Sequence, residues 1–226
     1  MKSSVDQPPK NLLCFSHLRW DFLLQRPQHL LLRFASDINV YFVEDPVFDA
    51  KEKPFFSFGT RSETLWKVVP HLMPGLSSDQ VTRCMAELID EFLRDAELSQ
   101  WTFWYYNPLA QLFVKKHKPK LTVYDCMDEV SGLRHVPQEM SILEKKLLEK
   151  ADLVFTEGYR LPENLKKMHA NIHSFPNSVV QGNSAFSWNE NYKAMFRLMQ
   201  SVVACKNAHL HNFRRRAYVD QQLNIT

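Results

Sequence analysis

The sequence predicts an α/β fold: a doubly wound parallel sheet of about seven strands, followed by an added C-terminal helix. Two observations lead to this prediction. Short apolar segments alternate along the chain with longer segments whose apolar residues recur at helical spacing. The apolar segments are also hydrophobic at neighbouring positions, which is typical of strands buried on both faces of a parallel sheet. Helices are therefore expected to cover both faces.

The expected elements follow from these runs and from helix-start signals. The strand segments are 11–16, 39–43, 65–69, 101–106, 121–126, 152–156 and 172–175. Pro27 and Pro137 suit the first turns of two helices. Ser77 and Gln80 form a capping box, which predicts the start of another helix. A short helix is expected at 109–116.

The composition and net charge are typical of an ordinary globular protein. Its 226 residues leave room for one domain of roughly 100–200 residues and an appendage. The net charge of +3 does not favour a nucleic-acid partner. No apolar run approaches the roughly 20 residues that span a bilayer, and the polar N-terminus does not resemble a signal peptide. We expect a cytoplasmic protein, and leave open a peripheral contact at the inner membrane face through basic clusters at 115–120, 166–167 and 214–216.

The positions of the cysteines and glycines argue against three kinds of site: disulfides, a zinc site and a glycine-rich phosphate-binding loop. Cys14, Cys84, Cys126 and Cys205 lie far apart and form no C-x-x-C pair. Reduced thiols are expected, buried at Cys14 and Cys126, rather than disulfides or a zinc site. The five glycines form neither a G-x-G-x-x-G motif nor a P-loop, so no glycine-rich phosphate cradle is expected.

Polar residues crowd the segment after the first expected strand, where ligands bind in doubly wound sheets. They include His17, Arg19, Asp21 and Arg26. An arginine beside a helix N-terminus can pair with a phosphate, so we predict that these four residues bind substrate. The alternative is a solvated loop.

Three carboxylates follow the fifth expected strand: Asp125, Asp128 and Glu129. They could hold a sugar hydroxyl, act as a base or bind a cation, and their spacing does not decide between a base and a metal site. We predict a catalytic role for them. The alternative is that they cap the next helix and pair with Arg134 or Lys145.

Other strand ends offer further candidates. Tyr105 and Asn107 suit sugar binding, through an aromatic face and an amide, but they also suit plain packing. His71 follows the third expected strand and could reach the same edge, although a lone histidine is more often structural. We include all three as candidate substrate-binding residues.

Several strings lie at these strand ends: NLLCFSHLRWD (11–21), QRPQHL (25–30), FVEDPVF (42–48), VPHLMPGL (69–76), WYYNP (104–108), VYDCMDE (123–129) and ADLVFTEG (151–158). Together they resemble one group of bacterial GT-B glycosyltransferases, similar to families 1 and 4 and found in surface-polysaccharide and cell-envelope biosynthesis. The resemblance implies a Rossmann-like acceptor domain, a second domain that binds a nucleotide-sugar donor, and as a rule no metal.

The resemblance also suggests a domain organisation. It covers 11–179, so residues 1–179 are expected to form the acceptor-side domain and 180–226 a linker and a C-terminal helical segment. At the crossover, Val180 stands where an aspartate normally follows. Ser187 and Glu190 form a capping box before a helical pattern that resembles the last helix of such enzymes. The donor domain, roughly 150 residues, is then expected to be absent; an unrelated or frameshifted tail after Val179 is the alternative.

Two functional hypotheses follow from the resemblance. The family would transfer a hexosyl group from a nucleotide-sugar to a saccharide or lipid-linked acceptor, and this chain is expected to be inactive alone. No cofactor is expected, because the nucleotide-sugar belongs to a complete two-domain enzyme. The alternative is a non-catalytic acceptor-binding or assembly subunit that pairs with itself as a homodimer or with a separate donor-domain chain.

Overall fold

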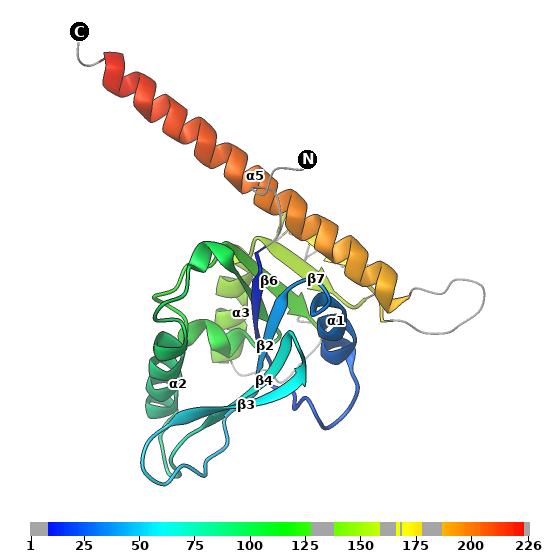
Figure 1. The fold of residues 1–226 in the computed structure, drawn as a ribbon, viewed down its shortest axis with the longest axis vertical. Coiled ribbons are helices and arrows are strands. Elements are labelled where there is room, and N and C mark those ends of the chain that lie inside the picture. Colours follow the sequence, from blue (N-terminus) through cyan, green and yellow to red (C-terminus); the bar gives the residue numbers. More distant parts are fainter. Residues whose placement is uncertain (1–8, 128–137, 159–165, 168, 178–186, 224–226) are drawn as a thin grey trace.

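The computed structural model describes residues 9–127, 138–158, 166–167, 169–177 and 187–223. Within them an eight-stranded sheet has the order β3-β4-β2-β1-β5-β6-β7-β8 (Figure 1). The strands are β1 (Asn11–Phe15), β2 (Asn39–Val43), β3 (Phe55–Ser62), β4 (Leu65–His71), β5 (Trp101–Tyr105), β6 (Leu121–Cys126), β7 (Leu153–Thr156) and β8 (Ile172–Ser174). Neighbouring strands are parallel except for the antiparallel pair β3–β4.

Helices cover both faces of this sheet, as predicted. They are α1 (Arg26–Phe34), α2 (Ser78–Phe92), α3 (Gln138–Lys150) and α5 (Trp188–Leu223). Successive β1 side chains belong to opposite cores: Leu13 and Phe15 pack with residues of α2 and α3, whereas Leu12 and Cys14 pack with residues of α1 and α5. This two-sided burial explains why the strands read as continuous apolar runs.

One strand was not predicted from the sequence, and one predicted helix is shorter and of the 3-10 type. β3 is an edge strand in which partly buried and exposed residues mix, so it lacks the continuous apolar run of the inner strands. The helix expected at 109–116 is a short 3-10 helix, η3 (Pro108–Leu112), which Asn107 caps by accepting a hydrogen bond from the Leu109 N–H at 3.0 Å. The capping box of Ser77 and Gln80 is present at the start of α2.

The C-terminal helix α5 packs its first half on α1. Met195, Met199 and Val203 are buried in the core that contains α1, and the ring of Tyr192 meets Phe34 edge-on at 5.0 Å. The second half extends away from the sheet (Figure 1). Ser187 and Glu190 cap its start as the sequence suggested.

The four cysteines form no disulfide: Cys14 and Cys126 are buried, Cys84 is half-buried and Cys205 is exposed. In the part of the chain that the structure describes, no helix is both long enough and apolar enough to cross a bilayer.

Candidate functional site

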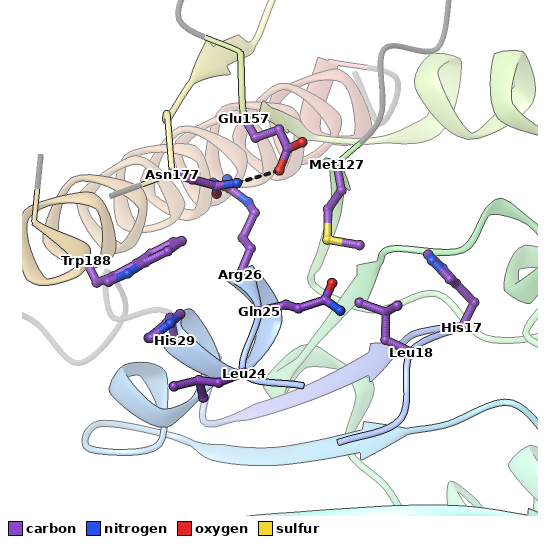
Figure 2. A pocket seen from close by; sticks show the side chains of 10 residues that line it. All are labelled: His17, Leu18, Leu24, Gln25, Arg26, His29, Met127, Glu157, Asn177 and Trp188. Atoms are coloured by element: carbon purple, nitrogen blue, oxygen red, sulfur yellow. Dashed lines mark hydrogen bonds between the residues drawn. The ribbon is translucent and has the colours of Figure 1, made fainter. Parts of the chain in front are cut away.

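A pocket of about 460 Å³ lies at the carboxyl ends of the strands (Figure 2). Segments that follow β1, β6, β7 and β8 contribute to it, together with the starts of α1 and α5. The chain runs from β1 to β2 on one side and returns to β5 on the other, so β1 lies at the topological switch point where such sheets bind ligands. The lining residues are His17, Leu18, Leu24, Gln25, Arg26, His29, Met127, Glu157, Asn177 and Trp188.

Arg26 organises the floor of this pocket. It is the first residue of α1, and its side chain is only 1% exposed. Its Nε donates to both carboxylate oxygens of Asp125 at 3.1 Å, and its Nη2 donates to Oδ1 at 2.9 Å. Its Nη1 donates to the carbonyl of Phe175 at 2.6 Å and to Oδ1 of Asn177 at 3.4 Å. One guanidinium therefore joins α1, β6 and the segment after β8.

The predicted catalytic residue Asp125 lies beneath the pocket. Its side chain is fully buried, and it does not line the cavity. In this position it neutralises and orients Arg26, so its catalytic role stays a prediction. Asp128 and Glu129 lie outside the described residues.

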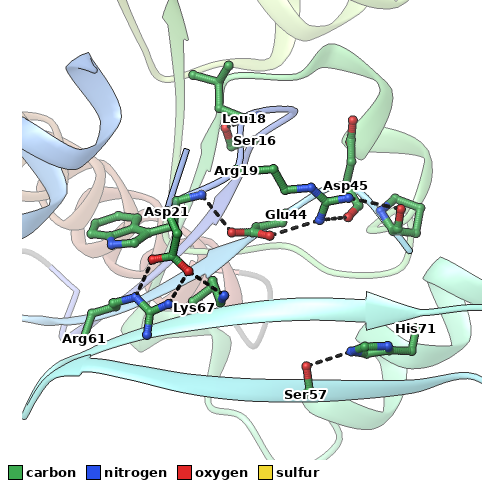
Figure 3. A network of polar contacts seen from close by, with 12 residues as sticks. Ser16, Leu18, Arg19, Asp21, Glu44, Asp45, Ser57, Arg61, Lys67 and His71 are labelled. Carbon is green, nitrogen blue, oxygen red and sulfur yellow. Dashed lines mark hydrogen bonds and ion pairs between the residues drawn. The ribbon is translucent and has the colours of Figure 1, made fainter. Parts of the chain in front are cut away.

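Arg19 does not line the pocket; instead it anchors the segment that follows β1 (Figure 3). Its Nη1 donates to Oε2 of the buried Glu44 at 3.0 Å and to the carbonyl of Asp45 at 2.7 Å. The other oxygen of Glu44 accepts the backbone N–H of Trp20 at 2.8 Å. The guanidinium of Arg19, which was predicted to bind substrate, thus holds this loop in place.

Asp21 pairs with two cations at the protein surface. It accepts a hydrogen bond from Lys67 Nζ at 2.8 Å and also pairs with Arg61, while its own side chain is 55% exposed. The hydrogen bond from Lys67, reinforced by Arg61, lowers the pKa of this carboxyl. Asp21 stays outside the lining of the pocket.

His71 and Tyr105 also lie away from it. Nε2 of His71 lies 2.8 Å from the Ser57 hydroxyl and Nδ1 lies 2.7 Å from Asp49, while Phe55 stacks on the ring. The contact with Ser57 joins β4 to β3 (Figure 3), and the contact with Asp49 adds the β2–β3 connection. Tyr105 is buried and stacked on Phe15 at 5.3 Å, and burial raises the pKa of its phenol.

Asn107 helps to line a second, smaller depression together with Asp45. Burial raises the pKa of Asp45, against the lowering influence of His17, Arg19 and the Asn107 side chain. The carboxyl of Asp45 is therefore near enough to His17 for the two side chains to interact electrostatically. His17 in turn lines the main pocket. The structure thus brings His17 and Arg26 to the main pocket and Asn107 to the second depression.

Several lining residues were missed as site candidates. Glu157 follows β7 and Asn177 follows β8, so the strand-end rule could have found them. Asn177 donates to Glu157 at 2.8 Å (Figure 2). Trp188 stacks on His29 with ring centroids 4.6 Å apart. No sequence signal pointed to Trp188, because its segment lies far along the chain from the others.

Metal-ligating side chains do not gather here. Among the described residues, no group of three or more His, Cys, Asp and Glu side chains has an arrangement that could hold a metal ion. Glu157, Asn177 and Gln25 instead offer carboxylate and amide groups, which suit hydrogen bonds to hydroxyls.

Comparison with known proteins supports the fold. No protein-family model matches the chain, and no curated protein matches it. A solved structure of sucrose-phosphate synthase from Thermosynechococcus elongatus is similar, with a TM-score of 0.55 and 11% identity over 85% of this chain and 98% of that one.

Two other similar structures concern trehalose phosphate. One, described as trehalose-6-phosphate from E. coli bound with UDP-2-fluoro glucose, has a TM-score of 0.49 and 10% identity, over 74% of this chain and 48% of that one. The other is an alpha,alpha-trehalose-phosphate synthase (UDP-forming) from Burkholderia xenovorans in complex with glucose-6-phosphate, with a TM-score of 0.42 and 11% identity, over 70% and 41%. This chain therefore spans less than half of either structure. Its strand order, two-sided sheet and similarity to the sucrose-phosphate synthase give it the Rossmann-like α/β fold found in GT-B glycosyltransferases.

Proposed function

We propose that the pocket above Arg26 binds the acceptor of a glycosyl transfer reaction, and that the chain is the acceptor-side half of a GT-B enzyme of the surface-polysaccharide and cell-envelope group. The main support is the position of the pocket at the topological switch point, with hydrogen-bonding groups from several strand ends around it. Gln25, Glu157 and Asn177 would hold sugar hydroxyls, and Trp188 would form an aromatic wall.

The donor side needs cations that this pocket does not leave free. A nucleotide-sugar releases a diphosphate, whose developing charge must be stabilised. Arg26 is occupied by Asp125, and Arg19 is occupied by Glu44. We therefore propose that the nucleotide-sugar binds only when a separate donor domain is present.

The proposed organisation is an acceptor-side domain, 1–179, joined to a linker and terminal helical segment, 180–226. The packing of α5 on α1 supports it, because the helix completes one core of the domain.

Acceptor binding can be tested by titrating the purified chain with methyl glycosides, disaccharides and UDP-glucose while tryptophan fluorescence is recorded. Trp188 is the tryptophan that lines the pocket, so a binding saccharide should change the emission, and Trp188→Phe should remove that change. Gln25→Ala should weaken binding by roughly 5–30-fold, the effect of about 1–2 kcal/mol for a lost hydrogen bond. Tight binding of UDP-glucose, with none of any saccharide, would overturn the assignment.

A non-catalytic acceptor-binding or assembly subunit is the second candidate. The buried pairing of Asp125 with Arg26 favours it, because this carboxylate is not presented to a ligand. Incubation of the chain with labelled sugar nucleotide and acceptor tests this second candidate, and no product is expected from the chain alone. Product formed by this chain alone would exclude the non-catalytic subunit.

A further inference from the structure

Three consecutive large apolar side chains are exposed on the loop between β1 and α1. Phe22 is 78% exposed, Leu23 56% and Leu24 65%. Other large apolar residues are exposed singly in the described part of the chain, without such a run. Contiguous exposed apolar surface of this kind usually marks a binding site.

The loop is held in this arrangement. The buried side chain of Gln28 donates to the carbonyls of Trp20 at 3.1 Å and Leu23 at 2.8 Å. Trp20 is itself buried, with its ring 5.0 Å from Phe42. The backbone is thus anchored before the run and within it, while the three apolar side chains remain exposed.

The exposed run continues into the pocket. Leu24 lines the pocket and lies beside His29, which stacks on Trp188 (Figure 2). The hydrogen-bonding pair Glu157 and Asn177 lies on another part of the wall. A ligand that follows this surface therefore meets polar groups inside the pocket and then an apolar strip outside it.

We infer that the acceptor is amphipathic: its sugar occupies the pocket, and a hydrocarbon chain lies along Leu24, Leu23 and Phe22. This inference rests on the proposed acceptor function of the same pocket. Continuity with the pocket favours a hydrocarbon tail of the substrate over a partner protein, because Leu24 belongs to both surfaces.

The test compares methyl and octyl glucoside, both monomeric and below micelle-forming concentrations. A fully buried methylene raises affinity about fourfold; along an open strip we expect about half that per group, and at least a tenfold advantage for octyl glucoside overall. Phe22→Ser combined with Leu23→Ser should remove most of this advantage while leaving methyl glucoside binding unchanged. Phe58→Ser is the matched control, because Phe58 is 52% exposed on β3 and should leave the advantage intact.

The outcomes separate the two proposals. If neither glucoside nor any other saccharide binds, both fail. If methyl glucoside binds and octyl glucoside gains nothing, the acceptor site stands and the amphipathic acceptor is overturned. Flotation with phosphatidylglycerol vesicles and sedimentation velocity complete the test. If the loop variant changes vesicle binding or self-association but not the octyl advantage, the loop is a membrane or protein contact instead.

Discussion

Arg26 lines the pocket, and Asp125 shapes the site from beneath by holding Arg26 in place. Both charges are buried, and each satisfies the other through three contacts of 2.9–3.1 Å. Arg26 then reaches Asn177, which donates to Glu157 in the pocket wall. The pair therefore positions the polar groups that we propose for acceptor binding.

Asp125→Ala should lower the free energy of unfolding by about 3–5 kcal/mol, because it leaves the Arg26 charge buried without its partner. Asp21→Ala is the control: it also breaks ion pairs, but at a half-exposed carboxyl, and should cost at most about 1 kcal/mol. Urea unfolding of both variants measures the difference. Equal losses would show that the Arg26–Asp125 pair is not buried in solution.

His29 predicts a dependence of stability on pH. Burial, together with the charge of Arg33, lowers the pKa of this histidine below its ordinary value near 6.5. The unfolded state therefore binds more protons as the pH falls through 6.5, and the stability associated with neutral His29 decreases. Wild type should lose stability relative to His29→Gln between pH 7.5 and pH 5.5. Thermal unfolding at both values measures this, and a constant difference between the two proteins would contradict it.

At the scale of elements, the loop before α1 and the helix α5 are both defined by contacts far along the chain. Gln28 fixes the loop locally, but Glu44 reaches it from the end of β2. α5 depends even more on distant partners, since Met195 and Met199 fill a core shared with α1 and β1. The sequence of either segment, taken alone, would not show that the segment lies against the pocket.

Truncation separates the two halves of α5. A chain that ends at residue 186 exposes Phe34 and the rest of the α1 core, so it should aggregate or unfold. A chain that ends at residue 209 keeps Met195, Met199 and Val203 and should melt within a few degrees of the full chain, since about 1 kcal/mol corresponds to roughly 2–4 °C at this size. Differential scanning calorimetry checks both. A stable, monomeric chain ending at 186 would show that α5 is dispensable for the domain.

The reactivity of the four thiols tests burial at positions spread over the whole molecule. Cys205 is exposed, Cys84 is half-buried, and Cys14 and Cys126 are buried, where burial also raises the pKa of the Cys14 thiol. Ellman's reagent should therefore modify Cys205 rapidly and Cys84 slowly, and reach the other two only after denaturation. Mass spectrometry of partly labelled protein identifies the sites, with Cys205→Ser as the control. Fast labelling of Cys14 in the folded chain would be incompatible with the buried β1.

Much of the fold could be read from the chain because its signals are local. The apolar runs of β2 and β6, the capping box at Ser77 and the proline near the start of α1 each depend on neighbouring residues. β3 was missed because an edge strand, exposed on part of its surface, carries no continuous apolar run. The sequence by itself thus determined the α/β class, the main elements and the edge where a site should lie.

Only the tertiary structure decided which polar residues line the pocket. Arg19, Arg26 and Asp125 all resemble site residues in the sequence, yet each is held by a partner at least 25 positions away. Glu157, Asn177 and Trp188 come from distant segments and meet at one pocket. Ion pairing and cavity formation depend on which segments the sheet brings together, and the strand order that does so is a property of the whole chain.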